Sequence, residues 1–249
     1  AWAYAAMFGT FLAGGYYTPL NLDHPIASRN RTIAQFQPDV LVAMGVTDID
    51  ILDVADACRG VSIDTLSGMQ TGFEAASKHD LAYVMFTSGS TGQPKGVTHV
   101  HGSLRATADT YGSRVLGIRE DDIVYSAAKI FFAYGLGNAM TFPMSVGATT
   151  LLLAGRPTPD GVMAILGDEG PTLFCGVPTL FSAMLAAREG DGKVDTALRL
   201  CISAGEALPA AVGPSARVSS RVRKMESFCG APLPGGTLAL QSSSNTTSP

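Results

Sequence analysis

The segment that most constrains this chain is residues 86–99, FTSGSTGQPKGVTH, which follow the apolar run AYVMF. Its glycines allow sharp turns that bring backbone N–H groups against phosphate oxygens, and its hydroxyls can donate further hydrogen bonds. Its lysine supplies a countercharge. Together they predict a loop that binds polyphosphate, made of Thr87, Ser88, Gly89, Ser90, Thr91, Gly92 and Lys95.

This loop differs from the usual P-loop, in which G-x-x-x-x-G-K-[ST] runs into a helix. Here the spacing is G-x-x-G-x-x-K, and Pro94 precedes the lysine and disfavours a helix interior. Because Gly96-Val97-Thr98 looks like a return to extended structure, we predict that the loop joins two strands and can move. A flexible Ser/Gly linker is the alternative; the buried strand pattern before the loop and the framed lysine after it argue against that reading.

Short β-rich runs alternate with helical patterns up to about residue 205, which predicts a layered α/β fold. Several runs are apolar throughout, so we expect helices on both faces of the sheet. The expected strands are residues 16–20, 40–44, 82–87, 123–126, 149–153, 172–175 and 198–203. The expected helices are residues 28–36, 102–115, 136–146, 160–166 and 179–188.

Composition narrows the possible partners and location. With 249 residues, 46% hydrophobic residues and a net charge of −4, the chain is globular and lacks the basic field that nucleic acid binding needs. The four cysteines form no C-x-x-C pair, so we expect reduced thiols and no metal site. No stretch approaches the ~18 uninterrupted apolar residues of a membrane span, and no charged segment is followed by the apolar core of a signal peptide. We therefore expect a cytoplasmic protein without a membrane partner. A start at Ala1 suggests that the natural N-terminus is missing.

The phosphate-binding run resembles the signature of the adenylate-forming superfamily of acyl-CoA synthetases, peptide-synthetase adenylation domains and luciferases. In that superfamily a carboxylic acid attacks the α-phosphate of ATP, pyrophosphate leaves, and a thiol then displaces AMP. The resemblance implies that residues 87–92 and Lys95 hold the β- and γ-phosphates, with Thr91 and Lys95 as the catalytic candidates. It also implies ATP, Mg²⁺ and coenzyme A as cofactors, and the large N-terminal domain as the fold.

Two further segments sharpen the resemblance. Residues 203–209, SAGEALP, resemble the adenine-contacting segment, which implies that Gly205, Glu206 and Ala207 line the adenine; a strand ending in a glycine turn is the alternative. Residues 128–147, with RPTPD at 156–160 and FCGVPTL at 174–180, are similar to benzoate-CoA and related aryl-CoA ligases. The implied residues of an aryl pocket, with one hydroxyl to orient the acid, are Phe132, Ala133, Tyr134, Gly135, Gly176 and Val177.

For any one of these aromatic residues, ordinary core packing is the alternative. By the same reasoning His99 and His101 are expected to be scaffold residues rather than catalysts. Lys129 and Arg156 are expected to be solvated surface charges.

The resemblance covers residues 1–213 and none of 214–249. The tail holds eight serines and four prolines without a regular period, so we expect disorder or a poorly packed appendage. A frameshift near Gly213 is our hypothesis for its origin. The family's Thr-Glu segment, whose glutamate helps to hold Mg²⁺, and its C-terminal domain are absent from this sequence. We therefore expect a fragment with negligible turnover alone, of unknown oligomeric state. A peptide-synthetase adenylation fragment and a non-catalytic nucleotide-binding remnant stay open as alternatives.

Overall fold

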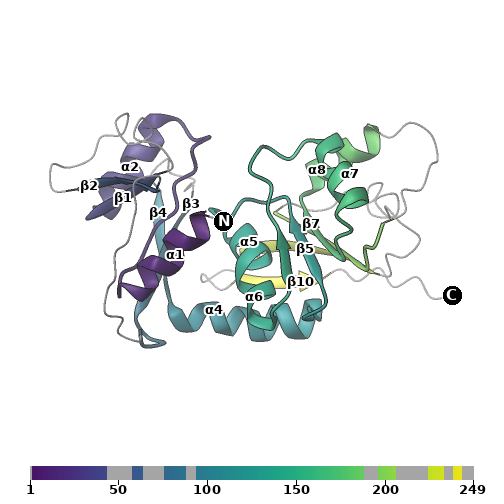
Figure 1. Ribbon diagram of the computed structural model, residues 1–249, viewed down its shortest axis with the longest axis horizontal. Helices are drawn as coiled ribbons and strands as arrows, with labels where there is room; N and C mark the ends of the chain where they lie inside the picture. Colours follow the sequence, from purple (N-terminus) through teal and green to yellow (C-terminus); the bar gives the residue numbers. More distant parts are fainter. Residues whose placement is uncertain are drawn as a thin grey trace. The chain divides into compact units, whose positions relative to one another are not determined.

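The computed structural model describes residues 2–43, 58–63, 76–87, 94–187, 196–205, 224–232 and 238–242. The chain divides into two compact units, Ala1–Leu104 and Arg105–Pro249 (Figure 1). The boundary falls within helix α4(His101–Thr107). Each unit is described by itself below.

In its described residues, the first unit contains two helices before α4 and two small sheets. The helices are α1(Trp2–Leu12) and α2(Ile26–Phe36). Strand β1(Val40–Ala43) pairs in parallel with β2(Arg59–Ser62), and β3(Leu81–Thr87) pairs antiparallel with β4(Lys95–Val100). Side chains of Tyr16 and Phe36 meet edge to face, with ring centroids 5.5 Å apart.

The expected strand at residues 16–20 is wrong. Only Tyr17 bridges to β3: its N–H donates to the carbonyl of Ala82, and its carbonyl accepts from the N–H of Val84. Helix α1 and strand β2 were not expected. Helix α1, WAYAAMFGTFL, is apolar almost all round and so shows no helical period in its sequence. Strand β2 has only four residues, which is too short for an alternating pattern.

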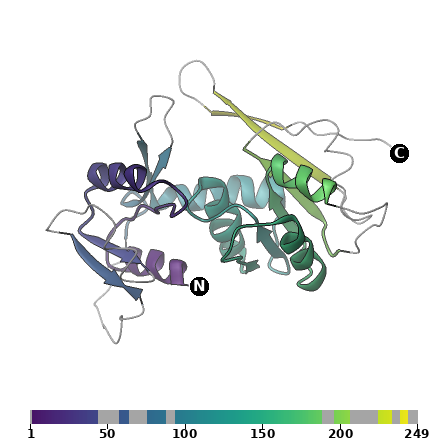
Figure 2. The same ribbon diagram turned by 90° about the horizontal axis from the view of Figure 1, so that it is seen from above.

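The second unit is built on a six-stranded sheet in the order β10-β9-β8-β7-β5-β6. The first five strands along the chain run in parallel, and the last is antiparallel to its neighbour. Figure 2 shows the last two strands, drawn in yellow-green and yellow, at the edge of this sheet. The strands are β5(Ile123–Ser126), β6(Thr149–Leu151), β7(Leu173–Gly176), β8(Leu200–Ala204), β9(Lys224–Pro232) and β10(Leu238–Ser242).

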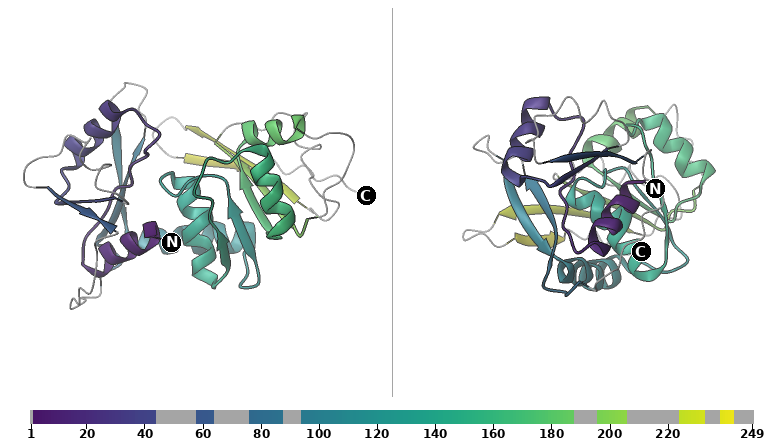
Figure 3. Two further views of the ribbon diagram at one scale, coloured as in Figure 1. Left: turned by 45° about the horizontal axis from the view of Figure 1, so that its top comes forward. Right: turned by 60° about the vertical axis from the view of Figure 1, so that its left-hand side comes forward.

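Helices cover both faces of this sheet, as expected (Figure 3). Helices α7(Pro159–Asp168) and α8(Pro178–Ala186) pack on one face against the stacked rings of Tyr125 and Phe174. The other face packs against the π-helix η2(Ala108–Leu116) and α6(Phe142–Val146). Successive side chains of a strand point to opposite faces, so the fully buried strands fill two separate clusters.

Two expected helices are segmented. The helix expected at residues 102–115 is α4 followed by η2. The helix expected at residues 136–146 begins earlier, as α5(Ala133–Leu136), and continues through the π-helical turn η3(Gly137–Thr141) into α6. Extra backbone residues in π-helical turns are frequent near functional sites. Here they follow the segment that carries the predicted aryl-pocket residues.

The tail contains regular structure where none was expected. Residues 224–232 form β9, which pairs in parallel with β8, and residues 238–242 form β10. Two strands at the edge of the sheet therefore come from a segment rich in serine and proline. Its composition did not indicate them, because main-chain pairing does not require a hydrophobic period. The domain boundary after residue 213 stays a prediction.

A buried ion pair joins the amino ends of three parallel strands. Asp122, just before β5, accepts hydrogen bonds from Arg199 Nε at 2.8 Å, from Arg199 Nη2 and from Thr172 Oγ1 at 2.7 Å. The N–H of Arg119 donates to the same carboxylate at 2.8 Å. Because Thr172 precedes β7 and Arg199 precedes β8, this carboxylate fixes where all three strands begin.

Candidate functional site

The predicted phosphate loop closes a β-hairpin in the first unit. Thr87, the last residue of β3, lies opposite Lys95, the first residue of β4. This confirms that the glycine-rich segment joins two strands rather than entering a helix. Lys95 is exposed. The predicted site residues Ser88, Gly89, Ser90, Thr91 and Gly92 lie outside the described residues.

The hairpin has a packed base. A Cβ on Gly96 would lie 3.0 Å from Cγ1 of Val84 and 3.2 Å from the ring of Phe86, so glycine allows β4 to lie close over these side chains. His99 stacks on the ring of Tyr83, with centroids 4.5 Å apart, and burial lowers the pKa of this histidine. His101 contacts the ring of Phe11 edge to face at 4.7 Å. Both histidines pack against aromatic rings, and their assignment as scaffold residues stays a prediction.

The predicted aryl-pocket residues come from two loops of the second unit. Residues 132–135 follow β5, whereas Gly176 ends β7 and Val177 caps α8. The chain leaving β5 leads to β6 on one side, and the chain leaving β7 leads to β8 on the other. Such a switch point, at the carboxyl ends of parallel strands, is where open α/β sheets bind ligands.

Tyr134 brings two of these loops together. Its hydroxyl lies 3.1 Å from the carbonyl oxygen of Gly176, the last residue of β7, and 3.2 Å from that of Ile202 within β8, so its proton is shared between these two carbonyls. Burial raises the pKa of Tyr134 well above its usual value, so this phenol stays protonated. Its one proton is engaged within the protein, and its side chain packs against the buried cluster that includes Phe142 and Cys175.

The two glycines among the predicted pocket residues have no room for a side chain. A Cβ on Gly135 would lie 2.0 Å from the carbonyl oxygen of Lys129. A Cβ on Gly176 would lie 2.9 Å from the ring of Phe181. These contacts are with the protein itself, so both glycines are explained by packing. Beside them Phe132 is 48% exposed and Ala133 is exposed, so these two are the members of the set that a ligand can reach.

The predicted adenine segment begins at the carboxyl end of β8. Gly205 directly follows this strand, is exposed and has a φ of +94°, a conformation that glycine adopts without strain. A Cβ there would meet nothing within 4 Å, so the backbone geometry alone accounts for the glycine. Glu206 and Ala207 lie outside the described residues.

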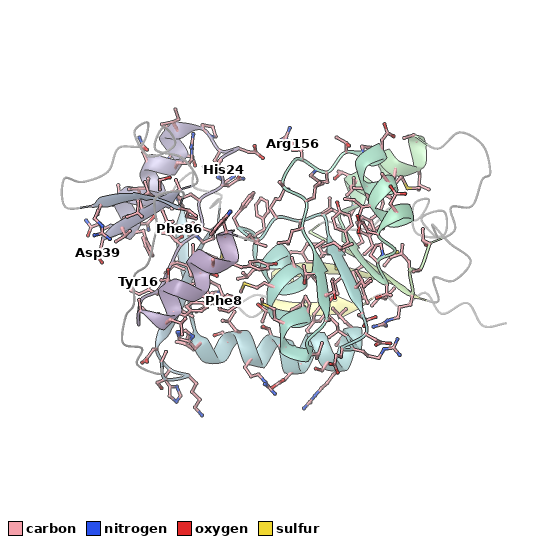
Figure 4. The ribbon with its side chains drawn as sticks, viewed as in Figure 1. Phe8, Tyr16, His24, Asp39, Phe86 and Arg156 are labelled. Carbon is pink, nitrogen blue, oxygen red and sulfur yellow. The ribbon has the colours of Figure 1, made fainter. Side chains whose placement is uncertain are left out.

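The expectation for Lys129 is wrong, and sequence reasoning missed its role. Its ammonium group donates to the main-chain carbonyls of Leu153, Ala154 and Gly155 after β6. A lysine directly after a buried strand, in a loop without acidic residues, was the signal available. Arg156, on the loop between β6 and α7, has an exposed side chain (Figure 4).

Within the described parts of the chain, no three His, Cys, Asp or Glu side chains gather closely enough to hold a metal ion. We therefore assign no residue to Mg²⁺. In the same parts, no helix is long and apolar enough to cross a membrane. Cys175 and Cys201 are buried thiols, and burial raises the pKa of Cys201 to about 12.

Curated relatives include several aryl-CoA ligases. The chain is 52% identical over 143 residues to a benzoate–CoA ligase of Thauera aromatica, covering 57% of this chain and 27% of that protein. It is 55% identical over 140 residues to a 4-hydroxybenzoate–CoA/benzoate–CoA ligase of Rhodopseudomonas palustris, covering 56% and 26%. The chain thus spans about a quarter of the length of these relatives.

Solved structures show the same relationship. The crystal structure of a benzoate CoA ligase from Burkholderia xenovorans matches with a TM-score of 0.80 and 34% identity, over 91% of this chain and 47% of that one. Residues 1–226 match the family described as AMP-binding enzyme, 13 residues beyond the boundary expected from the sequence. The chain belongs to this family of AMP-binding, adenylate-forming enzymes and corresponds to part of their N-terminal domain.

Proposed function

We propose that this chain supplies the ATP- and acid-binding part of an aryl-CoA ligase. An oxygen of a benzoate-like acid attacks the α-phosphorus of ATP, pyrophosphate leaves, and the thiol of coenzyme A then displaces AMP from the acyl-adenylate. The observation that carries this proposal is the convergence of residues 132–135, Gly176 and Val177 on one switch point of the sheet. The benzoate-activating relatives support the choice of an aromatic acid.

On the acid side, the site offers aromatic surface rather than charge. The rings of Phe131 and Phe132 contact each other, with centroids 4.7 Å apart. Because the hydroxyl of Tyr134 already donates to backbone carbonyls, we assign its ring, rather than its proton, to the wall of the pocket. A flat apolar ring is therefore selected mainly by shape and by apolar contact.

On the nucleotide side, we assign residues 87–92 and Lys95 to the β- and γ-phosphates, and Gly205, Glu206 and Ala207 to the adenine. A lysine at the start of β4 places a positive charge at the end of the loop, where it would stabilise the leaving pyrophosphate. Coenzyme A supplies the thiol of the second step, and Mg²⁺ would neutralise phosphate charge.

A stable analogue of the acyl-adenylate tests the substrate class. We expect the chain to bind benzoyl-sulfamoyl-adenosine more tightly than hexanoyl- or aminoacyl-sulfamoyl-adenosine, as measured by calorimetry. Lys95→Ala should weaken binding of ATP, whereas the matched change Lys78→Ala, at an exposed lysine of the same unit, should not. A preference for an aminoacyl analogue would instead favour a peptide-synthetase adenylation domain. Binding of ATP without any preference among acids would favour a non-catalytic remnant.

Turnover is a separate question. Removal of a single stabilising donor typically costs ~10²-fold or more in rate, and these 249 residues span about a quarter of the length of the benzoate-activating relatives. We therefore expect negligible release of pyrophosphate from ATP and benzoate by this chain alone. Robust release would refute the inactivity of the fragment, while supporting the proposed chemistry.

A further inference from the structure

Lys129 connects the loops that follow two neighbouring strands. It lies after β5, is half-buried, and its Nζ donates to three successive carbonyls after β6, those of Leu153, Ala154 and Gly155. An ammonium group carries three N–H donors that point away from one another. Three carbonyl oxygens therefore converge on one charged donor, and this lysine fixes the loop after β5 to the loop after β6.

The main chain of the same residue is fixed as well. The carbonyl of Lys129 accepts a hydrogen bond from the N–H of Phe132 at 3.0 Å, which closes a turn before α5. A Cβ on Gly135 would lie 2.0 Å from that carbonyl oxygen, so the first turn of α5 lies directly against it. The backbone positions of Phe132 and Gly135 therefore depend on where Lys129 is held.

Loss of the ammonium would act locally. Three carbonyl dipoles would then converge without a donor, and water could reach them because Lys129 and its partners are not fully buried. The core beneath has contacts of its own: Tyr125 and Phe174 are held by ring stacking and by helices α7 and α8, and the side chain of Leu153 packs against the same cluster. We expect the two loops to loosen while the sheet stays folded.

We propose that Lys129 is a positioning residue for the aromatic acid: by tying the loop after β5 to carbonyls 153–155, it holds Phe132, Ala133 and Tyr134 in the arrangement that receives the ring. This inference rests on the proposed function, because it concerns the acid pocket of the same site. Lys129 itself is not assigned a contact with the acid.

The test compares Lys129→Met, which keeps chain length but removes the charge, with the matched control Lys78→Met, at an exposed lysine. Amide hydrogen exchange of the whole chain measures whether Lys129 holds the loop after β5 to the loop after β6. In Lys129→Met, the amides of residues 130–136 and 153–156 should exchange about tenfold faster than in the wild type, because the loops open locally. The exchange rates at residues 123–126 should not change. The affinity of Lys129→Met for benzoyl-sulfamoyl-adenosine should fall about tenfold, whereas Lys78→Met should behave like the wild type.

A second variant guards against misfolding. Lys129→Arg keeps the charge but spreads its donors in a planar fork that cannot meet three convergent carbonyls equally, so its exchange and affinity should lie between wild type and Lys129→Met. Unchanged exchange in both variants, or faster exchange with unchanged affinity, would overturn the positioning role. If the wild type binds no adenylate analogue, the proposed function fails and the acid-binding part fails with it. In that case the hydrogen-exchange result still tests whether Lys129 holds the two loops together.

Discussion

Replacing the buried carboxylate of Asp122 should destabilise the second unit more than any surface substitution. Asp122→Asn keeps the shape of the side chain but removes the charge that Arg199 faces. The side chain of Asp122 is 1% exposed and that of Arg199 is 29% exposed. Removing one partner of a buried pair typically costs 3–5 kcal/mol, and partial hydration of Arg199 lowers this, so we expect a loss of about 2–4 kcal/mol.

Urea unfolding of the purified chain, followed by circular dichroism, measures this loss. Asp109→Asn is the matched control, because Asp109 pairs with Arg105 on an exposed helix surface, with side chains 48% and 74% exposed. The control should leave the unfolding midpoint unchanged within error. An equal shift of the midpoint in both variants would refute the reasoning, because burial would then contribute nothing to the value of the pair.

The pH dependence gives an independent check. Burial alone would raise the pKa of Asp122, but hydrogen bonds from Arg199, Thr172 and the N–H of Arg119 outweigh it and lower the pKa. A carboxyl group with a lower pKa in the folded state adds stability above its unfolded pKa of about 3.9, and this stability is lost as the pH falls through the folded value. Wild type should therefore lose stability below about pH 5 more steeply than Asp122→Asn.

Three further outcomes are expected. Gly135→Ala should cost about 3 kcal/mol in urea unfolding, because its Cβ would lie 2.0 Å from the carbonyl oxygen of Lys129; a cost below ~1 kcal/mol would contradict the close contact. Tyr134→Phe should cost about 1–2 kcal/mol by removing a donor from two strand carbonyls, whereas Tyr16→Phe, at a residue 46% exposed, should be neutral. Cys175 and Cys201 should resist iodoacetamide at pH 8 until urea unfolds the chain, and mass spectrometry of the native protein would expose any early labelling.

The sequence predicts the elements whose signal is local. The hairpin that carries the phosphate loop follows from Pro94 and the extended pattern after Lys95. The central strands follow from short apolar runs bounded by glycine and proline. Helix α1 was not predicted, because it is apolar almost all round and its sequence has no helical period. Strand β9 was not predicted; it is defined by its parallel backbone pairing with β8, which leaves no local pattern in the sequence.

Contacts between distant residues could not be predicted from any pattern. Arg199 lies 77 positions from Asp122, and the carbonyl of Ile202 lies 68 positions from Tyr134. Each contact exists only because parallel strands place their amino ends at one edge and their carboxyl ends at the other. The role of Lys129 was missed for the same reason, since its three carbonyl partners follow a different strand.

We propose that the two ends of the parallel strands in the second unit have different roles, one in stability and the other in ligand binding. At the amino ends of the strands, Asp122, Thr172 and Arg199 are joined by charge-assisted hydrogen bonds. At the carboxyl ends of the strands, the chains leaving β5 and β7 diverge, and Phe132 is 48% exposed. Because the amino ends of the strands are fixed, the loops at their carboxyl ends can diverge while the strands keep their register. In the proposed acid site, Lys129 holds the loop after β5 to the loop after β6, and Tyr134 holds the start of α5 to strand carbonyls of β7 and β8.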